Sequence, residues 1–217
     1  MSFTDPRPLA EFADLLPIKS RRWREQRSDE LAGLGSGDTL ALELATPLWA
    51  VDVDIDWSRW AEARQLMALV RSMDGPLRSF LMTNPLAEYP AADPDGTILG
   101  TATVTIDDIG SDNSSLAFAG LPAGYDLGWG DFGEVRFSSG PERRYVFEIR
   151  GEVSAAGDGT TALVQVGPHV WPGVAEGQTV YLKRPAAKFF IVPGTLQEGL
   201  VRRGLVDGWS FTALQRP

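Results

Sequence analysis

Residues 56–73 constrain the fold most, because they form the one long segment whose apolar side chains recur at helical spacing. Four of these side chains fall on a single helix face: Trp60, Ala63, Met67 and Val70. Asp56 is suited to cap the first turn, because its short carboxylate can accept the free amide protons there. Gly75 can adopt the left-handed conformation that ends a helix, and Pro76 cannot continue one. We therefore expect one amphipathic helix over residues 56–73.

The segments before this helix alternate between apolar and other residues, which is typical of strands with one buried face. A glycine-rich turn at residues 33–38 precedes a strand in which Leu40, Leu42 and Leu44 alternate with small or polar residues, and we expect it to be half-buried. Pro47 interrupts this strand. A second alternating strand then leads into the helix through Trp49, Val51, Val53 and Ile55. The sequence thus predicts a mainly β fold with one flanking α-helix.

A proline-rich segment follows the helix and a short strand at residues 80–82. Three prolines and a glycine between Asn84 and Gly96 mark a domain boundary. From residue 97 to 184, short alternating strands are separated by glycine and proline turns, as in a small antiparallel barrel or sandwich.

Two further strands follow that region, at residues 189–192 and 209–213. A C-terminal strand can complete the sheet of the first domain, which would make the middle of the chain an insertion. We therefore assign residues 1–96 and 185–217 to one β domain, and residues 97–184 to an inserted small β-barrel or sandwich.

Composition excludes several classes of protein. The 217 residues are 43% hydrophobic and 10% aromatic, which is enough for a packed core. The formal charge of −9 argues against a protein that grips phosphate backbones, because such proteins need clustered Lys and Arg. There is no cysteine, no apolar run of membrane-spanning length and no signal-peptide pattern at the start. We expect a soluble, acidic protein made inside the cell, without membrane insertion.

A local basic run at residues 21–27 surrounds Trp23. Two interpretations stay open: an exposed strand whose arginines face water or acidic neighbours, or a subunit contact. The contact would use Trp23 with Arg21, Arg22 and Arg24. Asp52 and Asp54 alternate with apolar residues on a predicted strand, so they are spread along one face rather than wrapped into a calcium loop. We expect an acidic stripe there and no metal site.

The motifs that suggest chemistry lack the context that the chemistry requires. Residues 128–133 match the G-x-G-x-x-G pattern, but a strand-like segment follows instead of a helix, so we expect a turn. The same turn contains Asp131-Phe132-Gly133, without the other kinase motifs. His169 is the single histidine and lies in a turn-like setting, where a structural or surface role is expected. Carboxylate pairs for glycan hydrolysis are possible among 29 acids, but none stands out. We predict no enzyme activity, no catalytic residue, no cofactor and no metal.

The sequence suggests a setting, buried or exposed, for four of the seven tryptophans. Trp57 and Trp60 fall with the core positions of the predicted helix, so we expect both to be buried. Trp129 and Trp171 lie in turns of the inserted region. Exposed turn aromatics can stack on sugars or fill a partner's pocket, and packing over the end of a small barrel is the alternative. Both are candidate surface aromatic contacts.

The order of several short segments resembles the minor tail proteins of long-tailed, siphovirus-type phages and prophages, in particular the distal tail proteins. The resemblance rests on the order of these segments from residue 28 to about residue 194. The segments are Ser28–Gly37, Pro47–Trp49, the helix end at Met73–Gly75, Arg78–Pro85, Gly120–Tyr125 with Gly130–Asp131, and Arg184–Pro185.

The resemblance implies a fold and a function. Distal tail proteins have a tail-tube-like β-sandwich flanked by one helix, and many carry a second, OB-like or galectin-like β domain. They form a hexameric ring that joins the tail tube protein to the baseplate hub protein, and DNA passes through it without specific binding. We therefore expect a virion structural protein at the tail tip, made in the host cytoplasm, with Trp23, its neighbouring arginines and the strand at residues 52–55 near subunit contacts or the lumen. A carbohydrate-binding β module that recognises a host surface glycan is the alternative.

Overall fold

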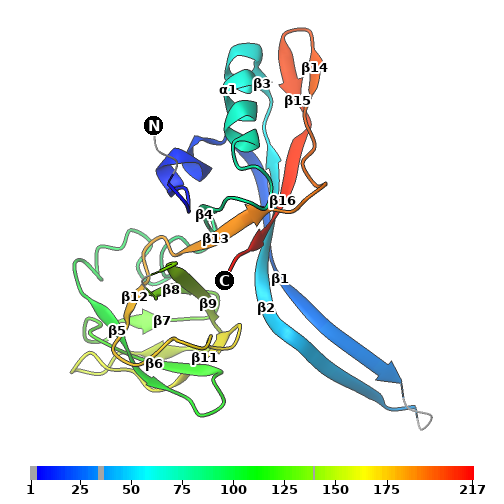
Figure 1. Ribbon diagram of the computed structural model, residues 1–217. Coiled ribbons are helices and arrows are strands. Elements are labelled where there is room, and N and C mark those ends of the chain that lie inside the picture. The colour runs from blue at the N-terminus through cyan, green and yellow to red at the C-terminus, as the bar shows by residue number, and fades with distance from the viewer. Residues whose placement is uncertain (1–3, 34–36, 139) are drawn as a thin grey trace. The chain divides into compact units, whose positions relative to one another are not determined.

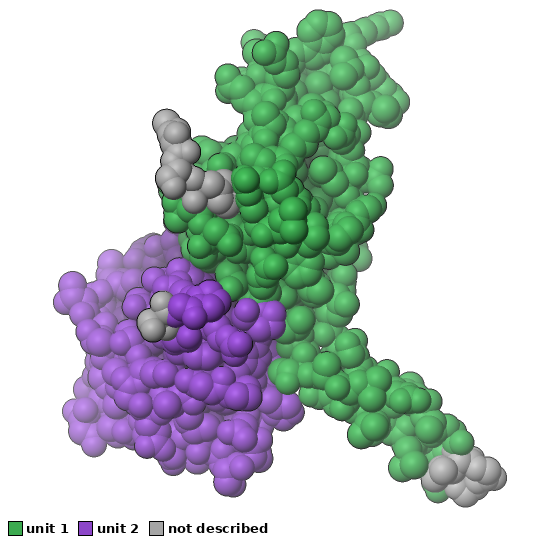
Figure 2. All heavy atoms as spheres, in the orientation of Figure 1, with its two compact units in different colours: residues 1–81, 188–216 green, residues 82–187, 217 purple. Residues whose placement is uncertain are grey.

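The computed structural model describes a mainly β chain with one α-helix (Figure 1). The described residues are 4–33, 37–138 and 140–217. The chain divides into two compact units, coloured separately in Figure 2. Unit 1 comprises Met1–Leu81 and Lys188–Arg216, and unit 2 comprises Met82–Ala187 and Pro217. Relative to the boundaries that the sequence suggests, residues 82–96 belong to unit 2.

A five-stranded sheet forms the centre of unit 1, in the order β1-β2-β16-β13-β4. Its strands are β1 (Ile18–Gly33), β2 (Thr39–Ile55), β4 (Phe80–Thr83), β13 (Ala186–Ile191) and β16 (Trp209–Gln215). Alternating residues of β2 and β16 are buried on one face, as the sequence predicts. Phe80 is the centre of an aromatic cluster on this core side, with its ring 4.4 Å from Phe12, 6.4 Å from Phe189 and 6.2 Å from Phe211.

β1 and β2 form one long antiparallel hairpin, paired from Ile18 and Ile55 to Gly33 and Thr39. The predicted break at Pro47 is therefore wrong. The ladder shifts register beside Pro47, and a proline is tolerated at such an irregularity because no ladder hydrogen bond needs its missing amide proton. Of the predicted turn at residues 33–38, residues 34–36 lie outside the described part of the chain.

The helix α1 (Trp60–Arg71) confirms the predicted helix but is shorter than residues 56–73. Asp56 does not cap it, because its Oδ1 accepts the neighbouring Trp57 amide while Arg59 occupies the N-cap position. The start is displaced because Ser58 and Arg59 form strand β3 instead. β3 joins a three-stranded sheet with β14 (Leu200–Arg202) and β15 (Leu205–Asp207). The helix ends at Arg71, two residues before the predicted end, and the predicted left-handed conformation of Gly75 is confirmed by its φ of +60°.

The segment before β1 packs against the core of the sheet. Two short 3₁₀-helices, η1 (Leu9–Glu11) and η2 (Ala13–Leu15), flank Phe12, which is fully buried. The backbones of Arg7 and Phe80 form an isolated parallel bridge, so this segment also lies beside β4.

Unit 2 contains a closed barrel with the strand order β11-β6-β5-β12-β8-β9. The strands are β5 (Val104–Ile109), β6 (Ser115–Ala119), β8 (Phe132–Phe137), β9 (Arg143–Ile149), β11 (Val164–Gly167) and β12 (Thr179–Tyr181). A separate pair consists of β7 (Asp126–Leu127) and β10 (Val153–Ser154). The rings of Phe118, Tyr145 and Phe147 stack inside the barrel. Gly133 is required beneath this stack, because a Cβ there would lie 2.4 Å from the Phe147 ring.

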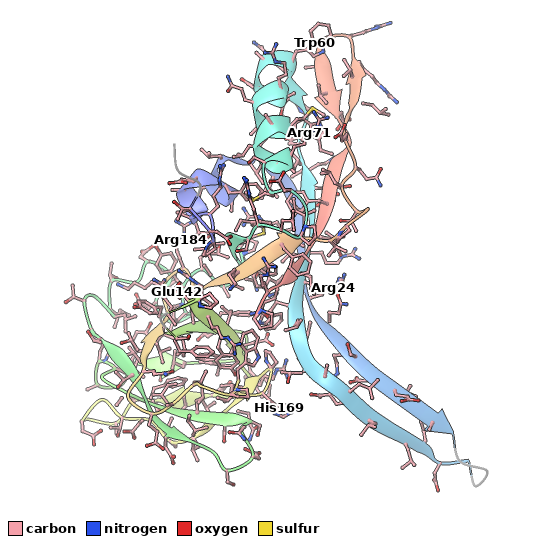
Figure 3. All side chains as sticks on the ribbon, viewed as in Figure 1. Arg24, Trp60, Arg71, Glu142, His169 and Arg184 are labelled. Atoms are coloured by element: carbon pink, nitrogen blue, oxygen red, sulfur yellow. The ribbon has the colours of Figure 1, made fainter. Side chains whose placement is uncertain are left out.

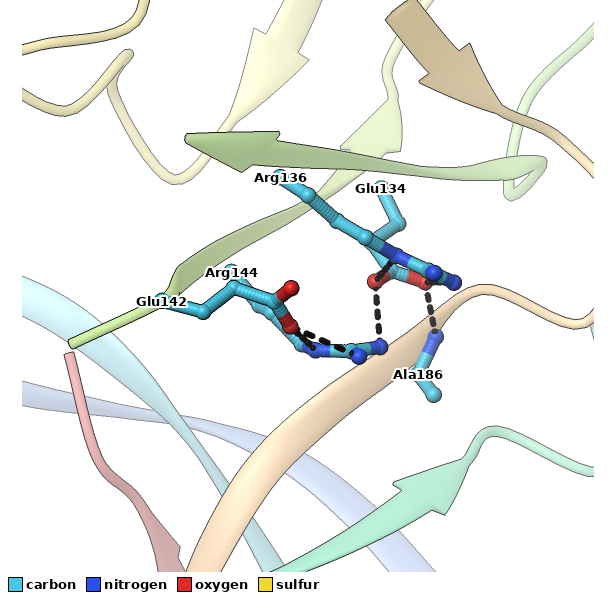
Figure 4. Close-up of polar contacts among 5 residues, drawn as sticks. All are labelled: Glu134, Arg136, Glu142, Arg144 and Ala186. Carbon is cyan, nitrogen blue, oxygen red and sulfur yellow. Dashed lines mark hydrogen bonds and ion pairs between the residues drawn. The ribbon is translucent and has the colours of Figure 1, made fainter. Parts of the chain in front are cut away.

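A buried carboxylate fixes the point where the chain leaves the barrel (Figure 4). Glu134 is fully buried and accepts hydrogen bonds from Arg136 Nε at 2.6 Å, Arg144 Nη1 at 2.7 Å and the Ala186 amide at 3.0 Å. Arg144 is also bonded to the exposed Glu142. Because Ala186 is the first residue of β13, the network fixes the start of that strand.

Candidate functional site

The outer half of the β1–β2 hairpin has two different faces. β16 pairs with β2 from Ala50 to Ile55, whereas from Thr39 to Ala45 the described residues place only β1 beside β2. No second layer covers this half in the described part of unit 1, and side chains on both faces are exposed. Figure 1 shows the hairpin projecting beyond the sheet.

One face of this half carries three leucines. Leu40, Leu42 and Leu44 alternate along β2 and are 57%, 61% and 61% exposed. Ala32 lies opposite Leu40, and Glu30 lies opposite Leu42. We define these five residues as the leucine face. The predicted strand is confirmed, but its predicted burial is wrong, because nothing in the described chain packs against this face.

The other face is charged, and its charges are paired. Asp29 and Glu43 lie directly opposite each other, where two carboxylates would repel. Arg27 lies between them, with Nε 2.8 Å from Asp29 Oδ2 and Nη2 3.0 Å from Glu43 Oε2. The hydrogen bond that Arg27 donates to Asp29, together with the negative charge of that carboxylate, raises the pKa of Arg27. The charges on this face are therefore satisfied within the chain.

The candidate interface and lumen residues divide between the two faces of the central sheet. Arg22, Arg24, Asp52 and Asp54 share the polar face with Thr212. Arg24 Nε lies 3.3 Å from Asp52 Oδ2, and Thr212 donates to Asp52 Oδ1 at 2.9 Å. Ser20 donates to Asp54 at 2.6 Å. The expected acidic stripe is therefore a face of mixed charge, because arginines from β1 alternate with the aspartates of β2.

Trp23 does not share this polar face with Arg22 and Arg24. Its ring lies 5.2 Å from the Phe189 ring and 6.0 Å from the Trp49 ring, on the core side of the sheet. The reason is strand geometry, since consecutive side chains point to opposite faces. By the same alternation Arg21 falls on the Trp23 side. Trp23 and the three arginines therefore do not share one face of the sheet, and their place near subunit contacts or the lumen stays a prediction.

The expected burial of Trp57 and Trp60 is wrong, since they are 55% and 58% exposed. Trp57 precedes the helix and lines a groove of about 570 Å³ with Leu15, Leu66 and Leu69. Trp60, the first residue of α1, lines a second groove, of about 410 Å³, on another side of the helix. α1 thus buries little more than Ala63 and Val70.

We name the second groove, which Trp60 lines, the α1 groove. Its walls come from α1 and from the β14–β15 hairpin: Trp60, Ala61, Ala63, Arg64, Met67, Val201 and Val206. This hairpin was not predicted from the sequence, because its strands have three residues each, too few to show a clear alternation. The signal that could have found it is the turn sequence Arg203-Gly204 between two apolar pairs.

The two candidate aromatic contacts of unit 2 differ. Trp171 is buried, with its ring 5.6 Å from Tyr145, so it packs on the barrel core. Trp129 is 68% exposed. The adjacent Gly128 lines a groove of about 390 Å³ together with Asp126, Glu152 and Ser154. His169 is exposed, as expected for a surface residue.

The motif at residues 128–133 is a turn that leads into β8, as the sequence predicts. Asp131 within it is buried and structural, because its carboxylate accepts the amides of Ala91 and Gly128, each at 2.8 Å. Within residues 4–33, 37–138 and 140–217, no three histidine or acidic side chains converge in a way that could hold a metal ion. No helix in that part of the chain has the length and apolar character needed to cross a membrane.

No protein-family model matches this sequence, and a search of curated proteins finds no match either. The residues and surfaces described above therefore carry the functional assignment.

Proposed function

We propose that this chain is a structural subunit of a phage tail tip, which assembles into a hexameric ring that joins the tail tube to the baseplate hub and lets DNA pass. The observation that carries the proposal is the leucine face. Three neighbouring leucines, each more than half exposed, stand on a hairpin that the rest of the described chain does not cover. Contiguous apolar surface on a projecting strand pair is typical of protein–protein contacts.

The architecture is compatible with that role. Unit 1 combines a sheet with one α-helix, and unit 2 is a closed barrel inserted in the chain. We assign unit 1 to the tail-tube-like ring domain and unit 2 to the OB-like or galectin-like domain. The order of the short sequence segments between Ser28 and Pro185 supports this assignment.

The charge of the polar sheet face also suits the proposal. A channel for DNA must not retain phosphates, so a basic lumen is unfavourable. The paired Arg24 and Asp52 make the polar face close to neutral rather than basic. In the proposed ring this face borders the lumen, and the tail tube and hub proteins are the neighbours along the axis.

Light scattering on a sizing column, with negative-stain images of the peak, tests the proposal. The expected species is a closed ring with a mass that is a multiple of 23.6 kDa. A chain that stays monomeric at high concentration, and does not assemble on isolated tail tubes, would refute it.

A carbohydrate-binding module is a second candidate function, and the exposure of Trp129 favours it. Trp129 directly follows Gly128, which lines a groove with Asp126, Glu152 and Ser154, so an exposed stacking surface is adjacent in the chain to a groove with hydrogen-bonding groups. Titration of host surface glycans against the tryptophan fluorescence of the protein and of Trp129→Ala tests this function. The wild type should respond and the variant should not.

A further inference from the structure

We propose that the leucine face of one copy docks into the α1 groove of the next copy, so that the chains associate head to tail. This inference rests on the proposed self-assembly and names the two surfaces that meet. Both surfaces belong to unit 1, and they differ in the charges that surround them.

The α1 groove is an apolar surface that matches the leucine face. Trp60 and Met67 from the helix face Val201 and Val206 from the β14–β15 hairpin across it. Trp60 is 58% exposed and Val201 is 62% exposed, close to the values for the leucines. Both surfaces therefore keep apolar area in water that a partner copy would remove.

The charges around the two surfaces are opposite. The outer half of the hairpin, residues 27–46, carries four acidic side chains and one basic one, which is already engaged by Asp29 and Glu43. Glu30 stands within the leucine face itself. Arg64 lines the groove and is exposed, and the exposed Arg203 lies in the turn of the β14–β15 hairpin. Arg59 and Arg202 both lie opposite Leu205 and therefore point to the sheet face away from Val201 and Val206.

Arg64 and Arg203 have no ion-pair partner in the described part of the chain. Glu62 lines the other groove, with Trp57, and Asp207 lies on the sheet face that points away, so the α1 groove keeps a positive excess. An acidic apolar face and a basic apolar groove are complementary, whereas two leucine faces would bring their carboxylates together. The charges thus favour contact between unlike surfaces.

A hairpin cannot reach the groove of its own chain. β2 has 17 residues and connects the turn of the hairpin at one end to β3 and α1 at the other. From Leu42 to the end of β2 at Ile55 an extended strand rising ~3.3 Å per residue spans about 43 Å, so roughly that distance separates the two surfaces within unit 1. Figure 3 shows Trp60 at the end of unit 1 away from the outer half of the hairpin. The contact must therefore form between copies.

The sizes also agree. The three leucines extend over about 13 Å of strand at ~3.3 Å per residue. The part of α1 that lines the groove runs from Trp60 to Met67, and at ~1.5 Å per residue it provides about 11 Å of groove wall. A contact between two different surfaces of the same chain is heterologous, and such contacts close into rings or extend into filaments. The proposed ring requires closure.

Disulfide trapping tests the contact, because the chain has no cysteine of its own. The variant with both Leu42→Cys and Val201→Cys places one thiol on each surface, at positions that are 61% and 62% exposed. Under mild oxidation it should form a ladder of covalent oligomers. Each single variant should stay monomeric on the denaturing gel. A matched control combines Leu42→Cys with Leu86→Cys, since Leu86 is 94% exposed in unit 2.

The outcomes separate this inference from the proposed ring. Oligomers by light scattering, with a ladder no stronger than that of the control, would overturn the head-to-tail contact and leave the ring proposal standing. Efficient dimers of Leu42→Cys alone would also overturn it, because they would show that two hairpins meet. A monomer in solution that gives no ladder would overturn both proposals.

Charge reversal gives an independent readout. Glu30→Arg and Arg64→Glu should each weaken self-association about fivefold, because each places like charges at the contact. In the double variant both charges are reversed, so opposite charges face each other again, and it should recover most of the association. Asp95→Arg reverses an exposed acidic residue of unit 2 and is the control that should associate normally. Additive weakening in the double variant would contradict the contact.

Discussion

Glu30 and Leu42 lie opposite each other in the β1–β2 ladder, so a carboxylate stands among the leucines of the leucine face. A charge in this position disfavours burial against a purely apolar surface, because the carboxylate would lose its water without gaining a partner. The pair thus makes the face selective for a basic partner. This relationship underlies the contact proposed between copies.

The leucine face can be removed without harming the fold. We predict that replacing Leu40, Leu42 and Leu44 by serine abolishes self-association and changes the free energy of unfolding by less than about 0.5 kcal/mol per site, because these side chains are exposed. Light scattering and urea unfolding measure the two effects. Leu86→Ser, at an exposed leucine in unit 2, is the control and should assemble normally. Normal assembly of the triple variant would contradict the proposed function.

The Glu134 network should be the most sensitive polar feature of unit 2. Glu134→Gln removes the buried carboxylate partner of Arg144 and leaves it only the exposed Glu142, so we expect a loss of about 3 kcal/mol in the free energy of unfolding, the lower end for a broken buried pair. Glu142→Gln is the control, because Glu142 is nearly half exposed and its pair should contribute no more than about 1 kcal/mol. Thermal and urea unfolding compare the two. Equal losses of unfolding free energy in the two variants would show that the burial of an ion pair does not determine how much it stabilises unit 2.

Asp93 should make stability depend on acid pH. Burial raises the pKa of this carboxyl, but hydrogen bonds from the amides of Leu99, Ile98 and Thr97 outweigh it and hold the pKa below its usual value. The unfolded pKa is about 3.9. The stability that Asp93 provides is therefore fully present above that pH, and it is lost as the pH falls through the lower folded-state pKa.

Unfolding measured at neutral and acid pH checks this prediction. Asp93→Asn should be less stable than the wild type at neutral pH and should lose less stability on acidification. Asp95→Asn changes an exposed neighbour and should behave like the wild type. An unchanged acid dependence in Asp93→Asn would rule out this role.

Local patterns predicted many elements correctly. The helix and the strands β4, β13 and β16 follow from spacing that reflects the nearest neighbours in the chain. The predicted start of the helix is wrong because β15, more than 140 residues later, draws Ser58 and Arg59 into a strand pair. Such long-range pairing leaves no local signal.

The alternation of apolar residues in the sequence identified strands, but it did not show which parts of them are covered by other elements. Leu40 and Val51 show the same pattern in the sequence, yet Val51 is fully buried and Leu40 is 57% exposed. The difference arises because β16 and the core reach Val51 and not Leu40. The sequence therefore predicted the strand that carries the leucine face, but not that the face is open. The α1 groove depends on β14 and β15 and could not be predicted from the helix alone.

Tryptophan quenching should report where copies meet. Trp60 and Trp129 are both exposed in the single chain, but only Trp60 lines the α1 groove. We predict that acrylamide quenching of Trp60 decreases on assembly, while that of Trp129 does not change. Comparison of Trp60→Phe with Trp129→Phe separates the two signals. Loss of the assembly-dependent change in Trp129→Phe, rather than in Trp60→Phe, would place the contact on unit 2.

The central claim is that this chain forms a closed ring, and its mass in solution tests that claim most directly. Light scattering over a wide range of concentration, with negative-stain images of the same sample, should give a ring of six copies of the 23.6 kDa chain. The triple leucine variant should elute as a monomer in the same experiment. A wild-type protein that remains monomeric throughout, alone and with isolated tail tubes, would contradict the account.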